Sequence, residues 1–484
     1  MTRLPLYNAL NDYLSKKNIP FYTSGHKMGK SIPKNFLKTS IKNLLQYDLT
    51  ELDGLDNLHE PEGVIKEAQE LAAKAYKADY TFFLINGSTV GNQAMIMSVC
   101  NNGDKIIIPE NSHKSVLNAL ILSGANPIYI PCKWNKKLGV TYGFDINKLE
   151  EELKKDSSIK AVFVTNPNYY GFCVDLKKIV EIAHKYNKPV LVDEAHGAHF
   201  NFHNNLPLSA ISCGADMVVQ STHKTLSALA QGSMLHLKSK IINKEKVKSI
   251  LNILQSSSPS YLLMLFLDFA RFQMITEGEK LLTNLLNLID EFKDKTNNIK
   301  GLYCYDKSIC KNYDIYDYDP TKIIIDFSEL GLSGFTAIDL LNDEFNIQAE
   351  MSTMFNIMSL ASIGNNKKDF EKLLSALKKI ARNYKKSNVL EDDFYLAKPK
   401  IPKTLLSPRE AFFAKKTKVL LKDSIGKICA ETISPYPPGI PIISFGQEIN
   451  SDIIEYLKFL ETKKYFIDGI EDNSLKTIKI VLEE

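Results

Sequence analysis

VLVDEAHGAHF (190–200) and DMVVQSTHKTLSALAQGSMLHL (216–237) carry an acid and an amine around which the rest of this sequence can be organised. Asp193 ends one apolar run, and Lys224 lies in a turn rich in Ser, Thr and His that follows a second apolar run. Runs of this length and composition are typical of buried strands. Ligands of parallel α/β sheets bind at the carboxyl ends of the strands, so we expect both side chains to face one crevice.

A candidate phosphate site lies upstream of this pair. TFFLI (81–85) has the pattern of a strand, NGSTVGN (86–92) that of a turn, and AMIMSVC (94–100) that of an apolar helix. Backbone N–H groups at the start of a helix bind anions, and the hydroxyl groups of Ser88 and Thr89 add to such a site. A simple Ser/Thr helix cap explains this stretch equally well when it is taken alone.

The acid, the amine and the anion site together fit pyridoxal 5′-phosphate (PLP). A lysine forms a Schiff base with this cofactor, and a buried aspartate keeps the pyridine nitrogen protonated so that the ring can accept electrons. Taken singly, Lys224 is explained as a surface charge and Asp193 as a helix cap. The order along the chain, Ser88, then Asp193, then Lys224, is that of fold-type-I PLP enzymes and favours the cofactor.

Further segments extend this pattern over most of the chain. They are FYTSGHKMG (21–29), TELDGLDNLHEPEGVIKEAQELAAKAY (50–76), NGSTVGNQAM (86–95), NSHKSVLNAL (111–120), NPNYYGFCVDLKKI (166–179), DEAHGAHF (193–200), QSTHKTLSALAQGSMLH (220–236), SSSPSYLLMLFLD (256–268) and YPPGIP (436–441). With them the chain resembles the Orn/Lys/Arg decarboxylase family in its short bacterial form, from about residue 4 to about residue 457. It departs from the family pattern at Ser24, Glu110 and SFGQE (444–448), where Pro, Arg and a PGE-like turn are usual. We expect these departures to change loops and not the chemistry.

The resemblance implies a PLP-dependent decarboxylase of a basic amino acid, with arginine to agmatine, for polyamine and spermidine biosynthesis, as the preferred reaction. It implies that Lys224 binds PLP, that Asp193 holds the pyridine nitrogen and that His113 stacks on the ring. The cofactor-binding set is completed by Ser88, Thr89, Ser221, His223 and His196. A cationic substrate side chain needs a carboxylate in its pocket. Glu350 and the acidic loop 48–62 are the candidates.

The resemblance also implies at least a homodimer. The serine-rich segment 256–260 and the acidic loop 48–62 are segments that, in fold-type-I enzymes, complete the site of the partner subunit. We therefore expect two copies of the chain to build each other's active site.

The chain has the pattern of an α/β protein. Strands are expected at 81–85, 105–108, 127–130, 160–165, 189–192, 216–219 and 233–237, and helices at 88–100, 112–123, 145–155 and 175–187. Such alternation predicts a mostly parallel sheet that helices cover on both faces. We expect an N-terminal arm (1–60), a PLP-binding large domain (61–298), a smaller α/β domain (299–386) and a C-terminal decarboxylase domain (393–484).

The arginine content bears on which PLP reaction is catalysed. Aminotransferases hold the α-carboxylate of the substrate with a bidentate arginine. Arg382 lies in a lysine-rich helix and Arg409 follows a proline, so neither fits this role, whereas Arg271 stays open. A carboxylate that is not held in this way is free to leave, which favours decarboxylation.

Composition limits the other classes of function. With 60 basic and 56 acidic residues the net charge is +4, and no basic cluster joins a nucleic-acid-binding motif, so we expect no nucleic-acid partner. Seven cysteines without a C-x-x-C motif are typical of a reduced, cytoplasmic protein. The longest apolar run, YLLMLFL (261–267), is too short to span a membrane, and the N-terminus resembles no secretion signal. We expect a cytoplasmic protein without membrane contact.

Several alternatives stay open. His196, His199 and His203 could bind a metal, as in a metallohydrolase, although Gly197 and the strand before it indicate a loop instead of one helical face. The chain could also be another PLP enzyme, such as an aminotransferase or aldolase, or a non-catalytic paralogue. Lysine or ornithine could replace arginine, because one methylene group is worth only about 1–3 kcal/mol in a pocket.

Overall fold

A seven-stranded sheet forms the centre of the protein. The computed structural model describes residues 15–21, 25, 27, 30–33, 55–384, 399–436, 439–462 and 466–482. The strands are, in spatial order, β2 (Tyr80–Leu84), β11 (Ser233–Leu237), β10 (Met217–Gln220), β9 (Val190–Asp193), β7 (Ala161–Thr165), β3 (Lys105–Pro109) and β4 (Asn126–Ile130). β11 runs antiparallel to both neighbours, and the other neighbouring strands are parallel. All seven predicted strands thus meet in one mostly parallel sheet, as the sequence predicts.

Helices cover both faces of this sheet. α4 (Gly87–Val99), α5 (Lys114–Ser123) and α9 (Lys244–Leu254) pack on one face, and α6 (Ile146–Lys155) and α7 (Leu176–Lys185) pack on the other. In β9, Leu191 belongs to the first core, whereas Val190 and Val192 belong to the second. Burial on both sides explains why these strands are continuous apolar runs. Each fully buried aliphatic side chain contributes about 1.5–3 kcal/mol.

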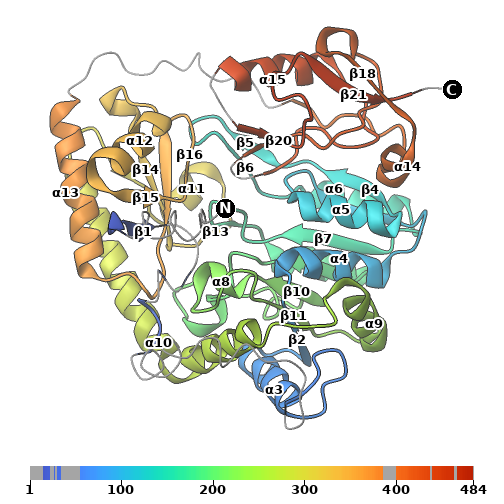
Figure 1. Cartoon of the computed structure of the whole chain (residues 1–484), viewed down its shortest axis with the longest axis horizontal. Helices are drawn as coiled ribbons and strands as arrows, with labels where there is room; N and C mark the ends of the chain where they lie inside the picture. Colours follow the sequence, from blue (N-terminus) through green and yellow to red (C-terminus); the bar gives the residue numbers. More distant parts are fainter. Residues whose placement is uncertain are drawn as a thin grey trace, which may run out of the picture.

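A second, antiparallel sheet lies beside the first. Its strands are β12 (Tyr303–Cys304), β14 (Lys322–Asp326), β17 (Asn356–Leu360) and β16 (Met351–Ser352), with α12 (Gly334–Phe345) and α13 (Lys367–Asn383) packed against it. The long helix α10 (Tyr261–Asn297) links this part to α3 (Val64–Tyr76), as Figure 1 shows at the lower left. β1 (Ile19–Phe21), from the N-terminal arm, pairs in parallel with β15 (Ile347–Ala349). The arm therefore contacts the smaller part of the structure.

The C-terminal part lies over α5 (Figure 1, red). It contains α14 (Pro408–Phe413), β18 (Lys416–Leu420), β19 (Ser434–Tyr436), α15 (Ser451–Thr462), β20 (Phe466–Asp468) and β21 (Thr477–Val481) around a core of its own. Arg409 Nη1 donates to the carbonyl oxygens of Ile121 (2.9 Å) and Leu122 (3.0 Å) at the end of α5. At the start of the same helix, Lys114 Nζ lies 2.6 Å from Asp468 Oδ2. Both ends of α5 are thus held by the C-terminal part.

The described chain also contains further short strands and α-helices. They are β5 (Lys133–Asn135), β6 (Val140–Tyr142), β8 (Phe172–Cys173), α8 (Thr222–Thr225), α11 (Ile309–Tyr313) and β13 (Asp317–Tyr318). β5 pairs with β6 and β8 with β13, both antiparallel. Among the helices that the structure describes, none combines the length and the apolar content needed to cross a membrane.

Candidate active site

The residues that we expect to face one crevice lie where β9 and β10 end and α4 begins. β9 ends at Asp193, β10 is followed by Ser221 and the short helix α8 that carries Lys224, and α4 begins directly before Ser88. Ser221 Oγ donates a hydrogen bond of 2.9 Å to Ser88 Oγ. The predicted anion site and the turn that carries the lysine therefore meet at one edge of the sheet, although they are 133 residues apart.

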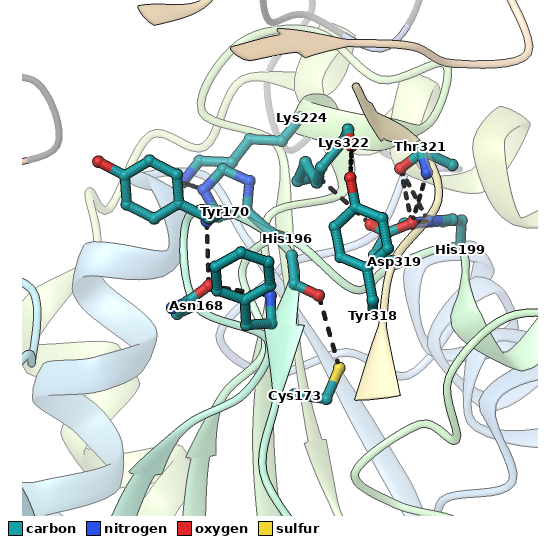
Figure 2. A network of polar contacts seen from close by, with 12 residues as sticks. Asn168, Tyr170, Cys173, His196, His199, Lys224, Tyr318, Asp319, Thr321 and Lys322 are labelled. Atoms are coloured by element: carbon teal, nitrogen blue, oxygen red, sulfur yellow. Dashed lines mark hydrogen bonds and ion pairs between the residues drawn. The ribbon is translucent and has the colours of Figure 1, made fainter. Parts of the chain in front are cut away.

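The amine of Lys224 points into the protein. Its Nζ lies 3.0 Å from His196 Nε2 (Figure 2) and 6.0 Å from the centre of the Tyr169 ring. Burial lowers the pKa of Lys224 below its ordinary value, and the carboxylates of Asp193 and Glu350 offset part of this effect. A lowered pKa leaves more of the amine unprotonated near pH 7, which is the form that attacks carbonyl carbon.

His196 is the hydrogen-bond partner of the Lys224 amine. Burial and the charge of Lys224 lower the pKa of His196 well below its ordinary value, so the imidazole is neutral. Its ring meets the ring of Tyr169 edge-on at 4.7 Å. Its Nδ1 is buried and has no hydrogen-bond partner among the residues that the structure describes.

Asp193 is 4% exposed and is held by two donors. The backbone N–H of Ala195 donates to Oδ1 (3.0 Å), and Asn92 Nδ2, from α4, donates to Oδ2 (2.9 Å). The carboxylate is thereby fixed in direction at the end of β9. This is the place where the sequence predicts a partner for a pyridinium nitrogen.

His113 is the N-cap of α5, and the charges of Asp193 and Lys224 act on it. Its Nδ1 accepts a hydrogen bond from the backbone N–H of Ser115 (3.2 Å) and lies 2.9 Å from Ser115 Oγ. Burial lowers the pKa of His113; Asp193 raises it, and Lys224 and Lys114 lower it further. The net direction is downward, so the imidazole is neutral near pH 7.

The start of α4 has the properties of an anion site. The helix has no side-chain cap and no acidic residue in its first turn, which also contains Thr89. Gly87 has φ 71°, and a Cβ added there would meet nothing within 4 Å, so open space lies in front of this turn. His223 Nδ1 donates to the carbonyl of Gly232 (2.9 Å), which holds that ring in the adjacent loop. The positive end of the helix dipole, two hydroxyl groups and open space fit a phosphate.

Several buried polar atoms around the crevice lack a partner within the described part of the chain. They are Asn92 Oδ1, Thr165 Oγ1, His196 Nδ1, Thr222 Oγ1 and Thr225 Oγ1. Buried polar atoms are normally satisfied, so such a group of atoms indicates room for a polar ligand. Together with Lys224, Asp193 and the anion site, they fit the predicted cofactor.

Glu350 lies close to this crevice. Tyr169 Oη donates a hydrogen bond of 2.5 Å to Glu350 Oε1, and the same tyrosine ring faces Lys224. The carboxylate of Glu350 also acts on the pKa values of the buried lysines Lys27 and Lys322. The sequence-predicted substrate carboxylate is therefore placed beside the sequence-predicted cofactor lysine.

The three histidines of the metal hypothesis point to different partners. His196 contacts Lys224, His199 Nε2 lies 3.3 Å from Asp319 Oδ1, and His203 Nε2 lies 3.0 Å from Thr283 Oγ1. Figure 2 shows His196 and His199 directed to opposite sides of one polar network. Throughout the described ranges, no group of three or more His, Cys, Asp or Glu residues is placed to hold a metal ion. The histidine pattern is explained by separate contacts.

Part of the acidic loop 48–62 has a structural role. Asp48, Glu51 and Asp53 lie outside the described residues. Asp56 accepts hydrogen bonds from the backbone N–H groups of residues 62, 63, 65 and 66 and so caps the start of α3. Burial raises the pKa of Asp56, but these hydrogen bonds outweigh it and the net shift is downward. Asp56 is thus engaged in holding the helix.

The arginines of the described part are engaged elsewhere or exposed. Arg271, the open candidate for a carboxylate clamp, donates from Nε to Asp268 Oδ1 (3.0 Å) on its own helix. Arg409 binds the end of α5, and Arg382 is exposed on α13. Arg271 is therefore already engaged and does not fit the role of a bidentate clamp.

The departures from the family pattern lie in loops where the structure describes them. Glu110 Oε1 accepts from the backbone N–H of Cys132 (2.7 Å), and Gln447 Oε1 accepts from that of Ser444 (2.8 Å). Ser24 lies outside the described residues. Glu110 thus joins the segments that follow β3 and β4, and Gln447 stabilises a local turn.

A buried chain of polar side chains crosses the sheet beneath the crevice. Thr81 Oγ1 lies 2.8 Å from His236 Nδ1, His236 Nε2 lies 3.1 Å from Gln220 Oε1, and Gln220 Nε2 donates to Glu194 Oε2 (2.6 Å). These residues come from β2, β11 and β10 and from the position after β9. Burial lowers the pKa of His236 to about 3 and raises that of Glu194 to about 8. A neutral imidazole that accepts from Thr81 and donates to Gln220 lets every group in the chain be paired.

Sequence reasoning missed three residues of the crevice, Asn92, Ser115 and Tyr169. Asn92 lies one helical turn after Ser88, so the two share a face of the predicted helix, and that spacing was a usable signal. Ser115 contacts the site only because α5 packs beside α4. Tyr169 meets Glu350 across 181 residues of chain, a contact that no local pattern predicts.

Comparison with known proteins agrees with this geometry. The model of the Orn/Lys/Arg decarboxylase major domain matches residues 4–369, and that of the Orn/Lys/Arg decarboxylase C-terminal domain matches residues 390–473. The chain belongs to the Orn/Lys/Arg decarboxylase family. It is therefore a PLP-dependent decarboxylase, and the fold-type-I prediction is confirmed.

Individual relatives of this decarboxylase differ in how much they share with it. It is 39% identical to the arginine decarboxylase of Bacillus subtilis over 480 residues, which cover 99% of this chain and 98% of that relative. It is equally similar, at 39% over 479 residues, to the arginine decarboxylase of Bacillus anthracis, with 99% and 97% covered. The constitutive lysine decarboxylase of Escherichia coli shares the fold, with a TM-score of 0.79, 19% identity and coverage of 99% and 82%.

Proposed function

We propose that this decarboxylase removes the α-carboxyl group of arginine and releases agmatine. The observation that carries the proposal is that Lys224 and Asp193 lie at neighbouring strand ends, with an anion site beside them, in a chain that matches arginine decarboxylases over its full length. The open space at the start of α4 gives room for the cofactor. The buried polar atoms without a partner give groups that it can bind. When bound, PLP supplies an electron sink for the bond that breaks at Cα.

The chain's own side chains hold and orient the reactants. Lys224 would hold the cofactor covalently, since its lowered pKa makes the amine a nucleophile. Asp193, fixed by two donors, would hold the ring nitrogen, and neutral His113 would cover the ring. Phosphate would bind the start of α4 through Ser88, Thr89, Ser221 and the backbone N–H groups of that turn, with His223 in the adjacent loop.

We assign the substrate's cationic end to Glu350. Tyr169 Oη orients the Glu350 carboxylate with a hydrogen bond of 2.5 Å, and an ionised carboxylate can accept several hydrogen bonds at once. A planar guanidinium can form two parallel hydrogen bonds with a carboxylate, whereas an ammonium acts as a point charge. This difference supports arginine over lysine and ornithine.

A substrate panel with a charge-removing variant tests this assignment. We expect wild-type enzyme to prefer arginine over lysine and ornithine in kcat/KM. Glu350→Gln should raise KM for arginine at least about tenfold, since a charge-assisted hydrogen bond is worth about 1.5–3 kcal/mol, while kcat changes less. Amine release is measured by chromatography at several arginine concentrations.

The control for this panel is Glu181→Gln, which removes an exposed carboxylate from α7 and should leave both constants unchanged. Faster turnover of lysine than of arginine would contradict the substrate assignment. An unchanged KM in Glu350→Gln would contradict the role of Glu350 alone.

We also propose that the active unit is at least a homodimer with shared sites. The two segments on which this rests lie together: His59 Nε2 is 2.8 Å from the carbonyl oxygen of Ser256, and Tyr261 Oη donates to that of Asp56 (2.7 Å). On α3 and α10, the helices that follow these two segments, Leu71, Phe272 and Ile275 are exposed apolar side chains. Burial of such side chains against a second copy stabilises association.

Dilution should therefore reduce activity. We expect specific activity to fall, together with the molar mass measured by light scattering, as the protein is diluted toward the dissociation constant of the dimer. Phe272→Glu should shift both transitions to higher protein concentration by placing charge in the contact. A monomer that keeps full specific activity at high dilution contradicts the shared site.

We make three further proposals, on cellular location, on pathway and on domain division. We place the enzyme in the cytoplasm and its product in polyamine and spermidine biosynthesis. We also propose the division into arm (1–60), large domain (61–298), small domain (299–386) and C-terminal domain (393–484). The separate cores of the large sheet and of the C-terminal part support that division.

A further inference from the structure

Asn92 joins the two groups that flank the predicted cofactor ring. It is 1% exposed, and its Nδ2 donates both to Asp193 Oδ2 and to Ser115 Oγ, each at 2.9 Å. An amide nitrogen carries two hydrogens, so both bonds can be made at once. The carboxylate can only accept, which fixes the amide with its nitrogen toward Asp193. One side chain of α4 therefore contacts β9 and α5 together.

The bond from Asn92 determines the hydrogen position on Ser115 and then on His113. Because Ser115 Oγ accepts the amide hydrogen, its own hydroxyl hydrogen is left to donate, and His113 Nδ1 lies 2.9 Å away. The backbone N–H of Ser115 also points at Nδ1 (3.2 Å). A nitrogen that faces two donors must be unprotonated, so the hydrogen of the neutral ring lies on Nε2.

We propose that Asn92 is a positioning residue that fixes the Asp193 carboxylate and, through Ser115, a single neutral tautomer of His113. The proposal rests on the proposed function, in which Asp193 and His113 contact the cofactor. Asn92 itself does not touch the reacting atoms. It sets the two groups on which binding of the cofactor ring depends.

The charges around His113 determine how protonation of its ring would change if these hydrogen bonds were lost. Asp193 from β9 favours the protonated ring, whereas Lys224 from α8 and Lys114 from α5 disfavour it, and Lys114 is itself paired with Asp468. Protonation of His113 at Nδ1 would place an N–H group against the N–H of Ser115. Removal of the hydroxyl contact should therefore allow protonation at higher pH, and the acidic limb of the kcat/KM profile should move upward in pH.

Two variants separate the two halves of the arrangement. Asn92→Leu has a side chain of similar size and removes both bonds of the amide. Ser115→Ala removes the hydroxyl that joins Asn92 to His113 and keeps the bond from Asn92 to Asp193. Asn118→Leu, on the exposed side of α5, is the matched control. For each purified protein we would measure the PLP dissociation constant by equilibrium dialysis, the pH profile of kcat/KM, and the melting temperature.

The expected results differ between the variants. Asn92→Leu should bind PLP roughly tenfold to a hundredfold more weakly, as for the loss of a hydrogen bond to a charged group, and should shift the acidic limb. Ser115→Ala should bind PLP within about threefold of wild type but shift the acidic limb in the same direction. Asn118→Leu should change neither. Wild-type PLP affinity together with an unshifted profile in Asn92→Leu would overturn the proposal.

A measurement on the unmutated protein covers the case in which Asn92→Leu does not fold. Nitrogen-15 spectra of histidine-labelled, PLP-free protein report which ring nitrogen is protonated, and His113→Gln identifies the signal of His113 among the nine histidines. We expect a neutral ring with hydrogen on Nε2; hydrogen on Nδ1 would refute the inference. If no basic amino acid is decarboxylated while the tautomer and the PLP affinities are as expected, only the proposed function fails.

Discussion

Lys224→Ala should lower the rate of agmatine release by at least about a thousandfold, because a covalent catalytic amine is lost. PLP should remain bound, since the start of α4, Ser221 and Asp193 are unchanged and still supply the anion site and the ring partner. The structural reason for the large effect is that Lys224 Nζ is held toward the crevice by His196 and Tyr169. Glu350 influences two further buried lysines, Lys27 and Lys322, and Lys322 Nζ lies 3.4 Å from Asp319 Oδ2.

Absorbance and product release would be followed together. Wild-type protein should show a visible PLP band that borohydride converts to a stable covalent product, and the variant should lose its cofactor on denaturation after the same treatment. Lys177→Ala, an exposed lysine of α7, is the control and should match wild type. Full activity in Lys224→Ala would rule out the assignment of this lysine.

Asp193→Asn should lower turnover by on the order of a hundredfold to a thousandfold. A buried charge pair with a protonated ring nitrogen is worth roughly 3–5 kcal/mol, and about 1.4 kcal/mol corresponds to a factor of ten in rate. The amide replaces the carboxylate with little change in volume, and the backbone N–H of Ala195 still has an oxygen to bind. The loss should therefore appear in kcat more than in the melting temperature.

The measurement for Asp193→Asn is kcat under arginine saturation, with the melting temperature of the PLP-bound protein beside it. Asp339→Asn, exposed on α12, serves as the control. A change in kcat of less than about tenfold, about 1.4 kcal/mol, would mean that Asp193 serves another purpose.

The central sheet could be predicted from the sequence because its strands are buried on both faces. Runs such as VLV (190–192), directly before Asp193, are apolar throughout, and both the strand and its end are visible in such a run. The rule that ligands bind at the carboxyl ends of parallel strands then places Asp193 and Lys224 together. The alternation of strands and helices likewise predicted helices on both faces of the sheet. One of them, α5, has His113 as its N-cap.

The parts that the sequence did not predict depend on contacts between distant segments. No periodicity places Tyr169 against Glu350 or Asn92 between Asp193 and Ser115, since each pair is joined only by packing of separate elements. The spacing of His196, His199 and His203 allowed a metal site, and only the backbone path after β9 shows that the rings face different partners. Side-chain direction in loops is set by tertiary contacts and not by local pattern.

The chain of hydrogen bonds from Thr81 through His236 and Gln220 to Glu194 has a consequence for how the protein loosens and reforms. Separating any one of these strands would leave a buried imidazole, amide or carboxylate without a partner, which costs more than the separation of apolar neighbours. The ligand end of the sheet should therefore open in hydrogen exchange as one cooperative unit and not strand by strand. Departure of the cofactor would then leave the strand ends in place. In a newly synthesised chain, the cofactor-binding site would be formed before PLP binds.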